Sequence, residues 1–189
     1  FLIIHQPIKS QVDINNKIML AQSFEQAGDY DKAIKLFEEI YSVQPQNYQV
    51  FESLNRVYTQ AKKYESSVTL IQNRIKLNPK DINLFGMLGS TYYLMGNESK
   101  AFDAWEDGIK TQPENQMSYR IIANHAIQRR AFEKAIDYLK RGKAVSENPE
   151  LYAYDLANIY SLTMQYKEAA SEYCSLLEKQ PTQMSAVEN

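Results

Sequence analysis

Residues 82–115 run INLFGMLGSTYYLMGNESKAFDAWEDGIKTQPEN, and the chemical pattern of this stretch returns along the chain at a spacing of 34 residues. Pro45, Pro79 and Pro113 follow one another at this spacing. A ladder of aliphatic residues keeps the same step: Leu20, Leu54, Leu88, Ile122 and Leu156. A fixed internal period of this length indicates a repeat architecture in which each unit is one supersecondary motif.

Three further ladders share this period. The aromatic ladder is Phe24, Tyr58, Tyr92 and Tyr160, with Ala126 in the place of the missing member. The small-residue ladder is Ala33, Ser67, Ala101, Ala135 and Ala169, and the large-residue ladder is Phe37, Ile71, Trp105, Leu139 and Tyr173. Together the ladders predict five complete repeats, at 14–47, 48–81, 82–115, 116–149 and 150–183, with 184–189 as the start of a truncated sixth.

Each unit is expected to form two helices. The first half carries apolar residues three to four apart, as at Leu88, Tyr92 and Met95, and the second half runs to the proline that ends it. Between the halves, Gly28 and Gly96 suit a left-handed turn residue. Lys62, Arg130 and Met164 occupy the same corner and must adopt that conformation at a steric cost. Because one helical hairpin cannot bury its apolar face alone, the units should stack on one another.

Composition narrows the classes of function. The formal net charge of the 189 residues is −2, and 23% of them are charged, so the chain promises no basic surface for nucleic acid or an anionic membrane. No apolar run approaches the roughly 18 residues that a membrane-spanning helix needs. Cys174 is the only cysteine, which rules out an intrachain disulfide, and we expect it to fill the core.

The N-terminal stretch differs from the repeats. Residues 1–13 are expected to be a leader or the remnant of a preceding segment, because they open with four apolar residues before Pro7. Residues 1–10 could be the tail of a secretory signal, which would imply an exported or periplasmic protein. The alternatives are a preceding helix or a disordered leader. A cytoplasmic location is favoured, but the sequence leaves the compartment open.

With these ladders, the chain resembles the tetratricopeptide repeat family from Ile14 to Pro181. The stretch 82–115 carries the family's pattern most fully, at Phe85, Leu88-Gly89, Tyr92, Gly96, Ala101, Trp105 and Pro113. Elsewhere, the chain departs from the pattern at Asn55, Arg74 and Ala126. The resemblance implies an all-α fold, a right-handed α-solenoid of stacked antiparallel helix-turn-helix hairpins. The pentatricopeptide family, which binds RNA, has a 35-residue unit, and the constant 34-residue step and a sequence pI near 5.8 disfavour it.

The resemblance also implies that the first helices line a concave groove that binds peptides. Projection of the helical period onto these helices predicts the lining: Gln22, Gln26, Arg56, Gln60, Ser90, Tyr93, Arg120, Asn124, Gln128, Tyr154 and Asn158. Amides both donate to and accept from a peptide backbone, and the arginines can hold carboxylates. Arg120 and Asn124 resemble part of the family's carboxylate clamp. Asp155 stands where that clamp has its next Asn, so we do not expect a chaperone C-terminus as ligand.

These features predict a protein-interaction scaffold that binds a protein or extended peptide. We expect no catalysis, no metal and no cofactor, because His5 and His125 have no spacing that suggests a metal or an acid–base pair. One alternative is a regulatory or substrate-docking part of a larger enzyme or assembly complex. Self-association through an exposed terminal repeat is another possibility. An RNA-binding helical repeat is the least favoured.

Overall fold

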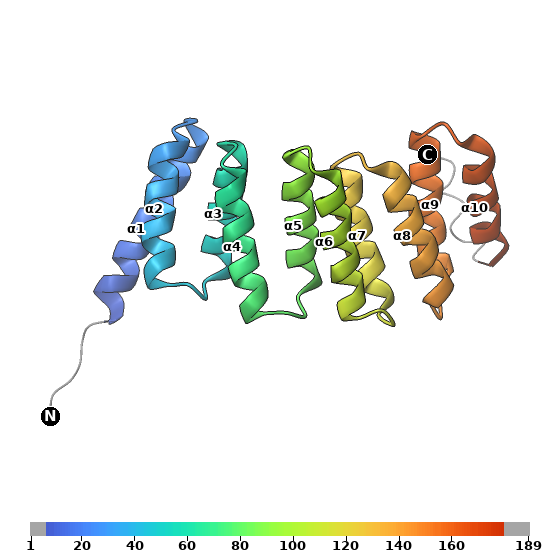
Figure 1. The fold of residues 1–189 in the computed structure, drawn as a ribbon, viewed down its shortest axis with the longest axis horizontal. Coiled ribbons are helices and arrows are strands. Elements are labelled where there is room, and N and C mark those ends of the chain that lie inside the picture. Colours follow the sequence, from blue (N-terminus) through green and yellow to red (C-terminus); the bar gives the residue numbers. More distant parts are fainter. Residues whose placement is uncertain (1–6, 180–189) are drawn as a thin grey trace, which may run out of the picture. The chain divides into compact units, whose positions relative to one another are not determined.

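The computed structural model describes residues 7–179, and within this range it is all-α, as the sequence predicts (Figure 1). The helices follow one another as consecutive pairs joined by short turns. Their bounds are α1 (Pro7–Gln26), α2 (Tyr30–Val43), α3 (Tyr48–Gln60), α4 (Tyr64–Leu77), α5 (Ile82–Leu94), α6 (Glu98–Thr111), α7 (Gln116–Gln128), α8 (Phe132–Val145), α9 (Glu150–Leu162) and α10 (Tyr166–Lys179). No described helix has the length and apolar character needed to cross a membrane.

The helix bounds can be set beside the predicted repeats. Helices α3, α5, α7 and α9 begin at residues 48, 82, 116 and 150, where the ladders place the starts of repeats two to five. We therefore propose that the chain is divided into the repeats that the ladders predict. Helix α1 differs from the expectation, because it begins at Pro7 and so includes residues 7–13 of the predicted leader. Proline is well suited to the first turn of a helix, and no further proline or glycine interrupts the chain before Gly28. Residues 1–6, with most of the possible signal tail, and 184–189, the predicted sixth repeat, lie outside the described residues.

The chain divides into two compact units, residues 1–71 (unit 1) and 72–189 (unit 2), with the boundary inside α4. In unit 1, α2 packs against both α1 and α3, and Phe37, Phe51 and Leu54 are buried there. Leu20 departs from its ladder, because it is 48% exposed. In a stack, the equivalent residue is covered by the preceding hairpin, and no described element precedes α1.

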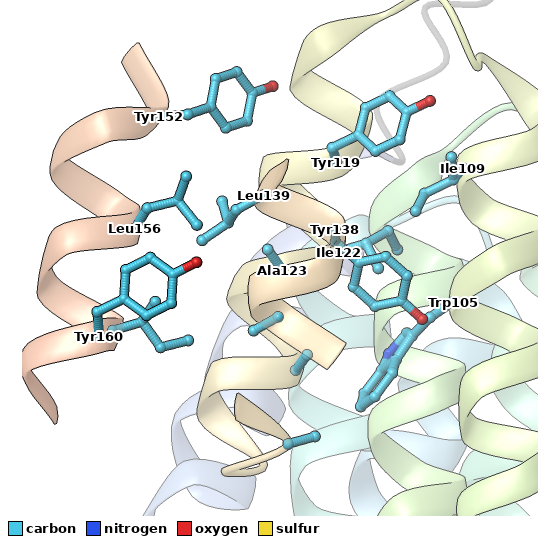
Figure 2. Packing of buried hydrophobic residues seen from close by; sticks show 14 of the residues in the cluster. Trp105, Ile109, Tyr119, Ile122, Ala123, Tyr138, Leu139, Tyr152, Leu156 and Tyr160 are labelled. Atoms are coloured by element: carbon cyan, nitrogen blue, oxygen red, sulfur yellow. The ribbon is translucent and has the colours of Figure 1, made fainter. Parts of the chain in front are cut away.

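The core of unit 2 is built from large side chains of successive helices (Figure 2). Trp105 of α6 is fully buried, and its Nε1 donates a hydrogen bond to the carbonyl oxygen of Gly86 at 3.1 Å. Its ring meets Tyr138 of α8 edge-on, with centroids 6.5 Å apart. On α9, Leu156 and Tyr160 point toward Leu139 in Figure 2. Residues of the sequence ladders therefore form the contacts between neighbouring hairpins.

The small-residue ladder marks the close contacts between paired helices. All five of its members are 3% exposed or less, as the pattern predicts. In unit 1, Ser67 takes the place of alanine, and its Oγ donates a hydrogen bond to Asn55 Oδ1 at 2.6 Å. Asn55 is one of the departures from the family pattern, so the two polar substitutions satisfy each other inside the hairpin.

The predicted left-handed corners are confirmed. Gly28 and Gly96 have φ of 76° and 75°, and Lys62, Arg130 and Met164 have φ of 57°, 61° and 61°. The expectation for Cys174 is wrong, because its side chain is exposed. Helix α10 buries Ala169 and Leu176, and the 3.6-residue period turns Cys174 to the opposite side.

Candidate functional site

Helices α7 and α9 of unit 2 each have one buried and one open face. On α7 the buried face holds Tyr119, Ile122 and Ala126, and on α9 it holds Tyr152, Leu156 and Tyr160. The open faces repeat in the same helical register. We define the α7–α9 surface as these residues: Met117, Arg120, Asn124, Gln128, Leu151, Tyr154, Asp155 and Asn158.

The first turns of α7 and α9 are held together directly. The hydroxyl of Tyr152 donates a hydrogen bond to the carbonyl oxygen of Gln116, the first residue of α7. Burial raises the pKa of Tyr152 to about 12, so this phenol stays protonated and remains a donor at neutral pH. One turn further on, Arg120 Nε donates to Asp155 Oδ2 at 2.9 Å. The two open faces therefore lie side by side.

The Arg120–Asp155 contact changes the role expected for the arginine. Both side chains are about 30% exposed, at 31% and 28%, and each neutralises the other. An incoming carboxylate would have to compete with Asp155 for the guanidinium. The arginine of the predicted clamp is therefore already engaged within the chain.

The amides and the tyrosine predicted on these helices differ in their exposure and in their contacts within the chain. Asn124 and Gln128 of α7 are exposed. On α9, Asn158 is exposed, but its Oδ1 accepts a hydrogen bond from the Tyr173 hydroxyl at 2.9 Å. Tyr154 is 43% exposed, and its ring lies edge-on to Tyr173, with centroids 6.4 Å apart. Helix α10 thus supports the open face of α9 from one side.

On α5, the structure places Ser90 beneath a neighbouring helix. Ser90 is 9% exposed, and its Oγ lies 3.2 Å from Nδ1 of His125 on α7. His125 Nε2 lies 2.8 Å from Asn83 Oδ1, and since an amide oxygen only accepts, Nε2 donates and Nδ1 accepts from Ser90. A Cβ atom added at Gly86 would lie 2.1 Å from His125 Cδ2. His125 therefore covers the part of α5 that the sequence assigned to a ligand.

Burial governs the charge of His125. It lowers the pKa of the imidazole to about 4, and the nearby Arg129 guanidinium lowers it further in the same direction. The ring is neutral at physiological pH, which agrees with a nitrogen that accepts from Ser90. Tyr93, the other residue predicted on α5, stacks on Trp105 with centroids 6.0 Å apart and is half-buried.

Ser90, His125 and Asn83 are residue types that also occur in hydrolytic sites. Here the serine is buried, its Oγ lies against His125 Nδ1, and the His125 ring lies against the Gly86 backbone. We interpret the three side chains as a link between α5 and α7. Over residues 7–179, no cluster of three or more His, Cys, Asp or Glu side chains could hold a metal ion.

Unit 1 contains the other residues that the sequence predicts to line the groove. Arg56 of α3 binds Glu25 of α1 through two hydrogen bonds, of 2.6 and 2.9 Å. These bonds raise the pKa of the guanidinium. Gln22 is half-buried, whereas Gln26 and Gln60 are exposed. As in unit 2, the predicted arginine pairs with an acid of a neighbouring first helix.

The comparisons with known proteins agree with this arrangement. Residues 18–82 match the family model described as tetratricopeptide repeat. Residues 18–82 carry tetratricopeptide repeats. The solved structure titled as the MamA protein is similar, with 16% identity, a TM-score of 0.51 and coverage of 91% of this chain and 94% of that one. A second solved structure, titled as a thermophilic TPR protein in Thermus thermophilus, has 20% identity, the same TM-score and the same coverage. No curated protein matches by sequence.

At these identities, the solved structures show the fold alone, and that fold is the stack of tetratricopeptide repeats inferred from the ladders. Repeats of this kind are scaffolds that bind proteins or peptides. The tetratricopeptide register also shows what the sequence prediction missed. Met117 and Leu151, each the second residue of its helix, are 43% and 42% exposed and belong to the open faces. Extending the projected face by one turn toward the N-terminus would have included both.

Proposed function

We propose that this tetratricopeptide-repeat chain binds a segment of a partner protein on the face of its first helices, without catalysing a reaction. The observation that carries the proposal is the continuous α7–α9 surface, which is open while the opposite faces of both helices are buried. Asn124 and Gln128 offer donors and acceptors to a peptide backbone. The same surface in unit 1 would use Gln26 and Gln60.

The electrostatics of the α7–α9 surface favour protein over nucleic acid. A nucleic-acid site needs several unpaired basic side chains to neutralise phosphates. The arginine of this surface, Arg120, is paired with Asp155. A protein segment makes no such demand, because its backbone is neutral and bonds to amides.

The test is capture of partners from native lysate on immobilised protein. The test variant is Asn124→Ala with Gln128→Ala, because both side chains are exposed and their loss leaves no buried charge. Arg120→Ala is less suitable, since it would leave Asp155 half-buried without its cation. A matched control replaces two exposed side chains of the second helices, Asp103→Ala on α6 with Glu133→Ala on α8.

We expect a partner that is captured by the wild type and by the control but lost, by roughly tenfold or more, with the Asn124 and Gln128 variant. Equal capture by all three proteins would contradict binding on the first helices. Circular dichroism of each variant shows whether its helices are intact before the capture is interpreted.

A further inference from the structure

We propose that the partner segment bound by the α7–α9 surface is uncharged and apolar, and that it is anchored on Met117, Leu151 and Tyr154. This inference rests on the proposed function and specifies the chemistry of its partner. We call these three residues the apolar patch.

The apolar patch is exposed, and its members lie in adjoining first turns of α7 and α9. Its three members are 42% to 43% exposed. Leu151 and Tyr154 lie three residues apart on α9 and so share one face. Met117 follows Gln116, whose carbonyl oxygen accepts from the hydroxyl of Tyr152, the residue after Leu151. The first turns of the two helices thus bring the patch together.

The charges around the patch are few, and one of them is acidic: Glu150, half-buried in the first turn of α9, immediately precedes Leu151. Helix α5 contains no Asp, Glu, Lys, Arg or His. On the α7–α9 surface, the charges are those of Arg120 and Asp155, which bind each other at 2.9 Å. The second helices contrast with this, because α6 and α8 each carry six charged residues. The charges of unit 2 are therefore concentrated away from the open face of its first helices.

This distribution of charge selects the partner. A charged side chain placed on the apolar patch would lose water, which costs free energy, and an acidic one would also be repelled by Glu150. An apolar side chain would bury itself and the exposed parts of Met117, Leu151 and Tyr154 together. Met and Tyr are also residues that interfaces favour at their buried centres. An acidic segment would have to displace Asp155 from Arg120 to find a cation.

The experiment selects peptides from a phage-displayed library of random peptides on the immobilised chain. Binding of the chosen peptides is then measured by fluorescence anisotropy. The patch variant is Met117→Gln, Leu151→Gln and Tyr154→Gln, which keeps good helix formers at exposed positions. The single variant Leu151→Gln gives a second readout if circular dichroism shows that the triple variant has lost its helices. The amide variant, Asn124→Ala with Gln128→Ala, completes the set.

We expect selected peptides rich in Leu, Ile, Met and Phe, with no net charge. The patch variant should bind these peptides about tenfold or more weakly than the wild type, and Leu151→Gln alone about threefold more weakly. Raising the salt from about 0.05 to 0.5 M should change their affinity by less than about threefold, because ionic contacts are screened and apolar ones are not.

Enrichment of acidic or basic peptides would overturn the inference, as would full binding by the patch variant. If that binding is lost with the amide variant, the proposed function stands and only the uncharged partner is refuted. If peptides bind the patch and amide variants as tightly as they bind the wild type, or none is selected, the proposed function fails as well.

Discussion

At the scale of single residues, Gly86 permits the contact between α5 and α7. A Cβ atom there would lie 2.1 Å from His125 Cδ2, well inside van der Waals contact. We predict that Gly86→Ala destabilises the protein by roughly 1–3 kcal/mol, because the imidazole must move and lose its bonds to Ser90 and Asn83. Urea denaturation followed by circular dichroism measures this change.

The control for Gly86 is the same substitution in a His125→Ala background. Without the ring, the three atoms nearest to the added Cβ are gone, and the better helix propensity of alanine should stabilise α5 by up to about 1 kcal/mol. If Gly86→Ala destabilised both backgrounds equally, the clash with His125 would not be the cause.

His125 also predicts how stability depends on pH. Its pKa is about 4 in the folded chain, against 6.5 for the free side chain, so unfolding is accompanied by proton uptake between these values. The stability that the neutral imidazole contributes is fully present above pH 6.5. It is lost as the pH falls toward 4, by up to about 3 kcal/mol. Comparison of the wild type with His125→Gln across this range isolates it from the carboxylates. Parallel curves for the two proteins would show that the imidazole is not responsible.

At the scale of elements, the corner of each hairpin imposes a left-handed residue. Met164 has φ of 61° and is 76% exposed, so its side chain gains little packing to offset the strain. We predict that Met164→Gly stabilises the protein by up to about 1 kcal/mol, since glycine adopts this conformation without steric cost. The denaturation midpoint measures the effect.

The matched control for Met164 is Gly96→Ala. Gly96 has φ of 75° and no atom within 4 Å of an added Cβ, so only the backbone conformation opposes alanine. We expect a loss of about 1 kcal/mol. An unchanged midpoint for Gly96→Ala together with a lower one for Met164→Gly would contradict the argument from φ.

At the scale of the whole molecule, stability accumulates from hairpin to hairpin. Helix α8 packs against α9, where Tyr152 fills the space over Gly142 and Leu156 lies near Leu139. We predict that a chain ending at residue 149 stays helical but unfolds at lower urea and with a smaller m-value. The removed interface no longer contributes to stability, and less surface is exposed on unfolding. A midpoint equal to that of the full chain would refute this nearest-neighbour account.

The sequence by itself determined the helices, the hairpins and the corners. Their signals are local, because apolar spacing, glycines and prolines act within a few residues, and the constant period repeats each signal five times. The same period identified the buried ladders, including Trp105 and Ala101, and it identified the face of α7 that carries Asn124.

The tertiary structure decided which polar residues of the candidate surface are free. Arg120 binds Asp155, Ser90 meets His125, and Arg56 binds Glu25, and these partners are 31 to 35 residues apart. The repeat period brings such residues near one another, but the packing of neighbouring first helices sets which pairs touch. It also buried Ser90, because close approach at Gly86 closes α5 against α7, and it left Leu151 on α9 exposed. Burial and pairing depend on contacts between repeats, which periodicity within one repeat does not specify.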